Sequence, residues 1–347
     1  MTKELSDRSK LILAAVVANY IATAEPVGSR TISRQDYVDL SPATVRNVMA
    51  DLEEMGLLEQ PHVSAGRVPT NEGLRLYVDT ILQVGELEDQ AKLMIHRALD
   101  ENQAYDLNGL LKTAGKALSD VNRLAAVVAA PNPDNDVFRQ MEFVRLSESL
   151  ILVVMVTRSG VVQNRVILSD EDVSQENLDK CTRYLNSLMG ELTLSQVRKR
   201  VAKEMAKEKN RFDAVLGRAL RLGQKALQGQ GDGDLFIEGR TNLMEAPEFA
   251  DVGRLRAIFQ AFEEKSTLLR LLERALEARG VRIFIGSEGL LSGLDGLTAV
   301  TASYGGQDSP SGALAVIGPT RMDYSKVIAT VDYTARLVSR IIDSRGD

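Results

Sequence analysis

The chain has 347 residues and a formal net charge of −6, and its apolar fraction of 44% is that of a globular protein with two or three domains. Its one cysteine, Cys181, excludes an internal disulfide and is typical of a reducing cytosol, and with only two histidines the chain lacks the ligands of a zinc site. We expect no signal peptide, and the apolar run 11–24 is too short to span a bilayer and contains Asn19.

The first predicted element is a helix over residues 6–22, with Ser6 as its N-cap. Apolar residues recur in it at helical spacing, which predicts one buried face. The residues expected to face inward are Leu11, Ile12, Ala15, Val16 and Ala18. We expect this helix to lie behind the two helices that follow.

A short second helix is expected from Ser29, which would cap it, towards Arg34. Backbone amides at a helix N-terminus, hydroxyl groups and guanidinium groups are the usual partners of DNA phosphates. The candidates for contacts to the DNA backbone are Ser29, Arg30, Thr31 and Arg34, together with Ser41 at the start of the next helix.

The third helix has the clearest start signal in the chain. Ser41 can accept hydrogen bonds from the first turn, and Pro42 suits the first helical position because it has no N–H to satisfy. Gly56 is placed to end the helix in a left-handed conformation. The apolar stripe expected to be buried consists of Val45, Val48, Met49, Leu52 and Met55.

The opposite face of the third helix carries small and hydrogen-bonding residues. The major groove admits such a helix, because Arg can bind a guanine edge and Asn an adenine edge. The candidates for base readout are Ala43, Thr44, Arg46, Asn47 and Ala50. The simpler reading of an exposed Arg46 is a solvated side chain, so the interpretation depends on the order of the elements.

A short hairpin should follow, running out through Leu57–Gln60 and back through Arg67–Val68. The candidates for contacts from this wing are His62, Ser64, Gly66 and Arg67. Helix, turn, helix and hairpin in this order predict a winged helix-turn-helix. The same arrangement also occurs in protein-interaction modules, and His62 can be an ordinary loop side chain.

Residues 1–75 contain eight Lys and Arg against ten Asp and Glu, so this region is itself net negative. Phosphates sense charge only within about a Debye length, roughly 8–10 Å, so the distribution of charge matters more than its sum. Four arginines at positions 30, 34, 46 and 67 would share one face of the predicted fold. We therefore expect weak non-specific binding and comparatively strong sequence specificity.

The elements after Thr70 predict an α+β domain. Helices are expected from Thr70 and over 87–102 and 106–120, with a domain boundary near residue 85. The expected strands are 124–130, 137–146, 150–156, 161–168, 283–285, 297–303 and 313–317, and a helix over 327–342 follows them. Strands separated by a long helical stretch indicate one α+β domain with an insertion.

The insertion, residues 174–245, should be mainly helical, with helices over 177–192 and 195–227. Its residues 175–230 hold twelve Lys and Arg against six Asp and Glu, which indicates either solvated helices or a second nucleic-acid surface. An apolar stripe near heptad spacing would gain by burial against a second copy. The predicted dimer contacts are Val201, Met205, Phe212, Leu216 and Leu220.

No catalytic, cofactor or metal site is predicted. The stretch 228–234 lacks the spaced oxygen ligands of a calcium loop, and the glycines at 286, 289, 305 and 306 are outside any phosphate-loop or dinucleotide pattern. The sequence contains no Cys and His, and no two carboxylates, at a spacing that would bring them together in a catalytic site. An enzyme is therefore not expected.

Three stretches carry a resemblance to a known family. They read Leu40-Ser-Pro-Ala-Thr-Val-Arg-Asn, Met49-Ala-Asp-Leu-Glu-Glu-Met-Gly-Leu-Leu-Glu-Gln-Pro-His and Ser64-Ala-Gly-Arg-Val-Pro-Thr. This pattern resembles the N-terminal domain of the heat-inducible transcription repressor HrcA family. Val48 departs from it, since an acidic residue is expected there.

The resemblance implies three domains. They are a winged helix-turn-helix DNA-binding domain over 1–84, a discontinuous GAF-like domain over 85–173 and 246–347, and an inserted dimerising domain over 174–245. It further implies a homodimer that binds double-stranded operator DNA, an inverted repeat called the CIRCE element, upstream of the chaperonin groE and dnaK operons. A GroEL-type chaperonin would modulate it, and it would act in the bacterial cytoplasm, associated with the nucleoid when bound.

Two alternatives remain open at this point. The winged helix could serve as a protein-interaction module, or the protein could be a regulator that senses a small ligand through its GAF-like domain. Binding of symmetric duplex DNA, with Arg46→Ala as a control, separates the first alternative from an operator-binding repressor.

Overall fold

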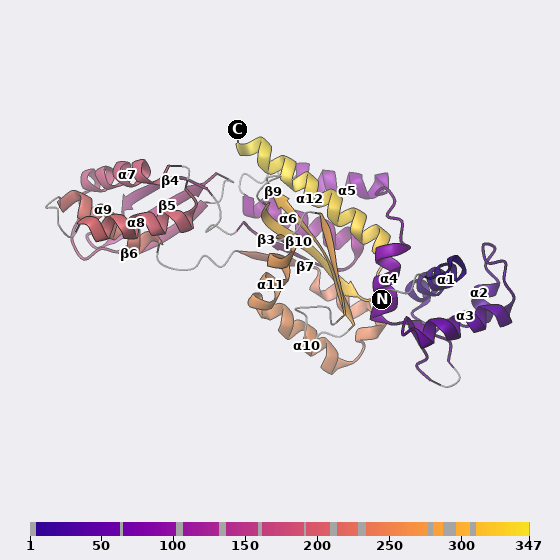
Figure 1. Cartoon of the computed structure of the whole chain (residues 1–347). Coiled ribbons are helices and arrows are strands. Elements are labelled where there is room, and N and C mark those ends of the chain that lie inside the picture. The colour runs from indigo at the N-terminus through magenta and orange to yellow at the C-terminus, as the bar shows by residue number, and fades with distance from the viewer. Residues whose placement is uncertain are drawn as a thin grey trace.

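Figure 1 shows the computed structural model of the chain, which describes residues 5–62, 65–101, 107–131, 137–158, 162–190, 192–208, 214–227, 234–276, 280–286, 296–305 and 310–346. Within these ranges the fold combines helices with separate antiparallel sheets of two, five and three strands. No helix in the described part of the chain is both long and apolar enough to cross a membrane.

The N-terminal part, residues 5–80, which we name the head, is a set of helices with one small hairpin (Figure 1). Its elements are α1 (Asp7–Thr23), α2 (Ser29–Ser33), α3 (Pro42–Glu54), β1 (Leu58–Glu59), β2 (Val68–Pro69) and α4 (Asn71–Thr80). Ser6 and Ser41 accept hydrogen bonds from the backbone amides of Ser9 and Thr44, so both predicted N-caps are confirmed. Gly56 has φ 76°, the left-handed conformation predicted to follow α3.

Two predictions of buried residues in the head are wrong. Ala18 is exposed, and Leu13 and Val17 are buried instead, because α1 packs against α3 and also against α4 and the hairpin. Met55 is 42% exposed, since it follows the last helical residue and no longer continues the stripe of α3. The other four members of that stripe are buried, including Val48, so its departure from the family pattern concerns packing.

The middle part, which we name the central domain, is a five-stranded sheet with helices on both faces (Figure 1). In the sheet the strand order is β7-β3-β10-β9-β8. Its elements are α5 (Asp89–Glu101), α6 (Leu107–Asn122), β3 (Ala125–Ala129), β7 (Leu235–Glu238), the 3-10 helices η1 (Arg240–Glu245) and η2 (Pro247–Phe249), α10 (Val252–Glu263), α11 (Lys265–Leu276), β8 (Val281–Ile285), β9 (Leu297–Gly305), β10 (Pro310–Pro319) and α12 (Tyr324–Gly346).

Alternate residues of these strands point to opposite faces of the sheet, as a pleated strand requires. Ala126 and Val128 pack with α5, α6 and α12, whereas Ala125 and Val127 pack with α10 and α11. The core of the first face continues without interruption into the buried residues of the head. The head is therefore packed against the central domain.

The remaining part, residues 137–227, which we name the insert, is a three-stranded sheet covered on one face by three helices. Its elements are β4 (Phe138–Arg145), β5 (Leu150–Thr157), β6 (Val162–Leu168), α7 (Gln175–Met189), α8 (Leu194–Glu208) and α9 (Ala214–Leu227). Ile151, Val153 and Met155 of β5 share one core with Cys181 and Leu185 of α7. In Figure 1 the insert and the head lie at opposite ends of the molecule.

The insert corrects two predictions. The strands 138–168 do not extend the central sheet but form a separate one, so the boundary expected at residue 173 divides a single packed unit. The sequence shows that β5 has an apolar face, as the central strands do. It cannot show which helices will cover that face. The single helix expected over 195–227 is two helices, ending at Glu208 and beginning at Ala214, and the residues between them lie outside the described part.

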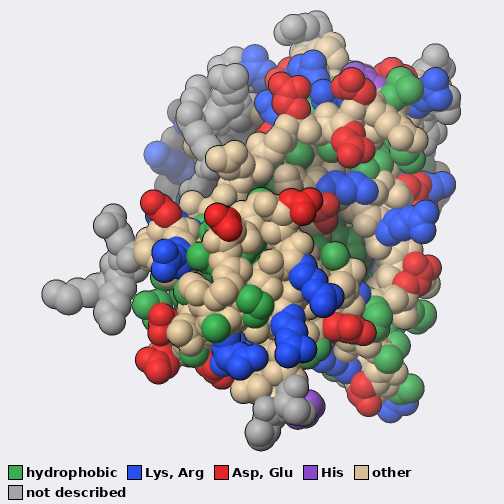
Figure 2. Space-filling model, turned by 90° about the vertical axis from the view of Figure 1, so that its right-hand side faces the viewer, with side chains coloured by type: hydrophobic (Ala, Val, Ile, Leu, Met, Phe, Trp, Pro, Cys, Tyr) green, Lys and Arg blue, Asp and Glu red, His purple; other side chains and the backbone are tan. Residues whose placement is uncertain are grey.

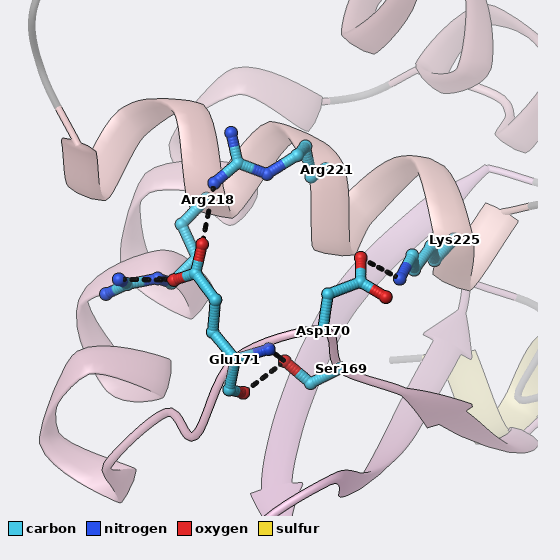
Figure 3. Close-up of polar contacts among 6 residues, drawn as sticks. All are labelled: Ser169, Asp170, Glu171, Arg218, Arg221 and Lys225. Atoms are coloured by element: carbon cyan, nitrogen blue, oxygen red, sulfur yellow. Dashed lines mark hydrogen bonds and ion pairs between the residues drawn. The ribbon is translucent and has the colours of Figure 1, made fainter.

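Charged side chains tie the loop between β6 and α7 to α9 (Figure 3). Lys225 Nζ lies 2.7 Å from Asp170 Oδ2, and Arg218 Nη2 lies 2.7 Å from Glu171 Oε2. Arg221 Nη2 lies 3.6 Å from the other oxygen of Glu171. Three basic residues of the predicted positive excess are therefore paired with acids of the same unit, which favours the reading of solvated helices over a second nucleic-acid surface.

Candidate nucleic-acid interface

The start of α3 is held by its cap, which orients the face proposed to read bases. The Ser41 hydroxyl oxygen accepts from the Thr44 amide at 3.2 Å and lies 2.9 Å from the Thr44 hydroxyl. Val45, Met49 and Leu52 are almost completely buried, which fixes the rotation of the helix. The opposite face is thereby presented to solvent.

The base-readout candidates lie on that outward face. Ala43, Arg46 and Asn47 are exposed, and Thr44 and Ala50 are partly exposed. Thr44 already uses its hydroxyl in the cap with Ser41, so its capacity to bind a base is reduced. Among the five candidates, the geometry therefore leaves Arg46 and Asn47 as the polar side chains that are available to base edges.

Three arginines, on α2, just after α2 and on α3, carry charge that no acid of the head neutralises. Arg30, Arg34 and Arg46 are exposed, and within the described residues none of them forms an ion pair. Thr31 is also exposed, next to Arg30. Uncommitted guanidinium groups are the chemistry that DNA phosphates attract.

Ser29 does not have the predicted role. Gly28 occupies the N-cap position of α2, and Ser29 is its first helical residue. The Gly28 carbonyl accepts from the amides of Thr31 and Ile32, so these two amides are engaged within the turn. Ser29 is partly buried, which leaves it a weaker candidate for phosphate than its two arginine neighbours.

Arg67 is the clearest departure from the predicted interface. Its Nη2 lies 2.7 Å from Oε2 of Glu53, its Nε donates to the same oxygen at 2.8 Å, and only 17% of its side chain is exposed. That Arg67 shares a phosphate-binding face with the other arginines stays a prediction, and the ion pair argues against it, because the carboxylate of Glu53 already neutralises its guanidinium group. Sequence reasoning missed Glu53 as a partner, since the two residues are separated by a turn and a strand.

Gly66 has a role in the fold of the head, because its position leaves no room for a side chain. Arg67 and Val27 exchange both backbone hydrogen bonds at 2.9 Å, so Val27 adds a third strand position beside the hairpin. A Cβ at Gly66 would lie 2.4 Å from the carbonyl atoms of Val27. The sequence signal, a glycine near a hairpin tip, could not reveal this neighbour from 39 positions earlier.

At the tip of the hairpin His62 is exposed, and its carbonyl accepts from the amide of Ala65 at 2.9 Å, which closes a turn. Gln60 donates to the Ala65 carbonyl at 2.9 Å and braces the same turn. Ser64, also predicted as a wing contact, lies outside the described residues. Of the four wing candidates, His62 is the described side chain that stays accessible.

Figure 2 views the molecule from the side on which the head lies. Several Lys and Arg side chains gather in the lower centre of this face, beside uncharged surface, and acidic side chains lie to either side of them. The basic area is small, in keeping with the net negative charge of the region. Such a surface suits short-range contacts to a duplex better than long-range attraction.

Two of the five predicted dimer contacts, Val201 and Leu220, are not available to a second copy. Val201 and Leu220 are 2% and 1% exposed and belong to the insert's own core, because the stripe on α8 and α9 packs against α7 and the sheet. Their assignment to an interface is therefore wrong. Phe212 and the side chains of Met205 and Leu216 lie outside the described part of the structure.

Within the described ranges, no group of three or more His, Cys, Asp or Glu residues is placed to hold a metal ion. Cys181 is buried in the insert, and burial raises the pKa of its thiol, so it lacks the character of a reactive cysteine.

Known proteins similar to this chain are transcription repressors. A family model described as HrcA protein C terminal domain matches residues 108–328. The heat-inducible transcription repressor HrcA of Geobacter sulfurreducens is 48% identical over 340 residues, which cover 98% of this chain and 99% of that protein. The protein of the same name from Syntrophobacter fumaroxidans is 45% identical over 346 residues, which cover 99% of each. A crystal structure of a hypothetical protein shares the fold, with a TM-score of 0.60 at 23% identity over 98% of both chains.

Proposed function

The chain belongs to the HrcA family of heat-inducible transcription repressors, and from this membership we propose that it silences its genes by covering an inverted-repeat operator as a dimer. The observation that carries the proposal is the outward face of α3. Arg46 and Asn47 are exposed there, opposite the buried stripe, and Arg30 of α2 and Arg34 just after it are exposed as well. Arg and Asn are the side chains that read guanine and adenine in the major groove.

The head acts, in this proposal, as a winged helix-turn-helix. The order α2, turn, α3 and hairpin supports it, and so does the packing of α1 behind α3. In such heads the second helix of the pair enters the major groove while the first lies towards the backbone. Arg30, Thr31 and Arg34 would then bind phosphates, and Arg46, Asn47, Ala43 and Ala50 would face the bases. Arg67 and Gly66 hold the hairpin in place.

We propose three domains with boundaries moved to those of the packed units. The DNA-binding domain is the head, and the central domain, residues 85–131 with 234–346, is GAF-like in having a five-stranded antiparallel sheet between helices. The insert, residues 137–227, interrupts the central domain between β3 and β7. These limits keep the core of the insert inside one domain, while one core of the central domain continues into the head.

The insert also carries the surface that we propose joins two copies. The face of its sheet opposite the helices is largely aliphatic, with Glu142 and Asn164 among its members, and Leu150, Val162, Val166 and Leu168 are between 36% and 66% exposed. Leu152 pairs with Val144 on one side and with Val166 on the other, which makes the patch continuous. A flat aliphatic face of this kind is self-complementary about a two-fold axis, so a second copy of the chain is the occupant that covers it.

The genes under control are, in this proposal, those of the chaperonin groE and dnaK operons, and the operator is the CIRCE element. Family membership supports this, and a GroEL-type chaperonin would keep the repressor competent for DNA. A repressor of chromosomal genes acts in the cytoplasm, associated with the nucleoid while it is bound. No cofactor enters the proposal.

Footprinting of the full chain on its own chaperonin promoter, with and without purified chaperonin, tests the proposal. We expect symmetric protection of an inverted repeat, strengthened by the chaperonin and weakened by Arg46→Ala. Failure to protect any symmetric duplex under either condition would overturn it and favour a protein-interaction module.

A further inference from the structure

One stretch of chain joins the head to the central domain. Residues 82–88 connect α4 to α5 without regular secondary structure, and a Cβ at Gly85 would have no neighbouring atom within 4 Å. A connection of this kind allows a domain to turn unless other contacts restrain it. The orientation of the head is therefore set by the contacts outside the connection.

Two arginines cross the boundary between head and central domain in opposite directions. Arg75 of α4 donates from Nη2 to the carbonyl oxygen of Ile283 in β8, at 2.6 Å. Arg321, in the turn between β10 and α12, donates from Nη1 to the carbonyl oxygen of Ile21 near the end of α1, at 3.3 Å. Because the two bonds join different elements on both sides, together they restrain an angle as well as a distance.

Arg321 is itself held by an acid of the central domain. Its guanidinium group pairs with the carboxylate of Glu248 in η2, and the two side chains are 20% and 22% exposed. Tyr20 lies beside this pair, and burial, followed by the charge of Glu248, raises the pKa of its hydroxyl. Charge-assisted bonds at partly buried sites are stronger than those on an open surface.

The head and the central domain also pack closely in the neighbourhood of Arg75. A Cβ at Gly286, just after β8, would lie 2.3 Å from Nδ2 of Asn71, the first residue of α4. Tyr77 of α4 is half-buried. Burial, followed by the charge of nearby Asp323, raises the pKa of its hydroxyl. The head therefore meets the central domain at two separate places, the end of α1 and the length of α4.

We propose that Arg75 and Arg321 are positioning residues that set the angle of the head and so determine which half-site spacing the dimer accepts. This rests on the proposed function, because spacing matters only where two heads bind one operator. A fixed head presents its recognition helix at one separation from its twin. A loose head samples many separations, which lowers the effective concentration of the second head at its half-site.

The test compares the full-length wild type with Arg321→Met and Arg75→Met on the operator, on a lengthened operator and on a single half-site. Adding about five base pairs between half-sites turns one of them by about half a turn of the duplex. We expect the wild type to lose about a hundredfold in affinity on the lengthened operator and each variant less than about tenfold. All proteins should bind the single half-site equally, since neither arginine lies on the reading face.

A matched control and a measurement without DNA complete the test. Arg256→Met, on the exposed face of α10, should keep the wild-type spacing preference. Spin labels at Ala18→Cys and Ala257→Cys, in protein diluted with unlabelled chains, should show one narrow distance in the wild type and a broader distribution in the two variants. Unchanged distances, or variants that discriminate spacing as the wild type does, would overturn the inference. If the wild type binds no symmetric duplex, the proposed function fails, and the distances alone decide whether the arginines hold the head.

Discussion

The guanidinium group of Arg67, at the return of the hairpin, lies 2.7 Å from the carboxylate of Glu53 near the end of α3. The pair joins α3 directly to the hairpin beside it. An arginine near a hairpin tip looks available for phosphate until its partner is known. The orientation of the hairpin against α3 therefore depends on an ion pair within the head.

The first prediction follows from that pair. Arg67→Met and Glu53→Gln should each destabilise the head, and a double-mutant cycle should give a coupling of about 1 kcal/mol, as for partly exposed pairs. Thermal unfolding of the full chain measures it. The salt dependence of operator binding should be the same for Arg67→Met as for the wild type, and a slope smaller by about one would show that Arg67 does bind phosphate.

The second prediction concerns Gly66, whose Cβ position is occupied by the backbone of Val27. Gly66→Ala should destabilise the head by about 1–3 kcal/mol, because backbone atoms cannot move aside as a side-chain end can. Gly85→Ala is the matched control, since no atom lies within 4 Å of the added methyl group, and its effect should stay within about 0.5 kcal/mol. Equal melting temperatures for the two variants would contradict this account.

The third prediction tests the outward face of α3. Arg46→Ala and Asn47→Ala should each weaken operator binding by about 1–3 kcal/mol, the cost of one lost bidentate base contact. Binding to a random duplex should change far less, because bases are not read there. Arg183→Ala, an exposed arginine on α7 of the insert, provides the control and should bind as the wild type does. Gel-shift titrations at fixed salt measure all of these affinities.

The fourth prediction concerns Arg30 and Arg34. Each should release counterions on binding, so Arg30→Ala and Arg34→Ala should each lower the slope of log affinity against log salt by about one. The loss of affinity should be similar on specific and random duplexes, since phosphates carry no sequence. A loss confined to the specific operator would instead make these arginines base readers.

The fifth prediction separates the surface of the insert from its core. Leu152→Asp and Val166→Asp, on the open face of the sheet, should yield folded monomers in sedimentation, because a charge would be buried between two copies. Leu220→Ala should instead lower stability by about 2–5 kcal/mol while the folded protein stays dimeric. Val252→Asp, at a position 71% exposed on α10, should change neither property. Dimers from both sheet variants would rule out this interface.

Local chemistry was sufficient to predict most elements of the head. The N-caps Ser6 and Ser41, the left-handed Gly56 and the buried stripe of α3 depend on neighbours within a few residues, so sequence carries them directly. The exposure of Arg46 and Asn47 follows from the same periodicity. The sequence therefore predicts α3 itself but not the contacts that orient it.

Tertiary structure decided which side chains were free to act. Arg67 is paired with Glu53, the backbone of Val27 leaves no room for a side chain at position 66, and Leu220 is buried by the insert's own helices. Strand β5 likewise joined the insert and not the central sheet. Helical and strand periodicity show which face of an element is apolar, but the partner that covers this face, or neutralises a charge, is chosen by packing between residues far apart in the chain.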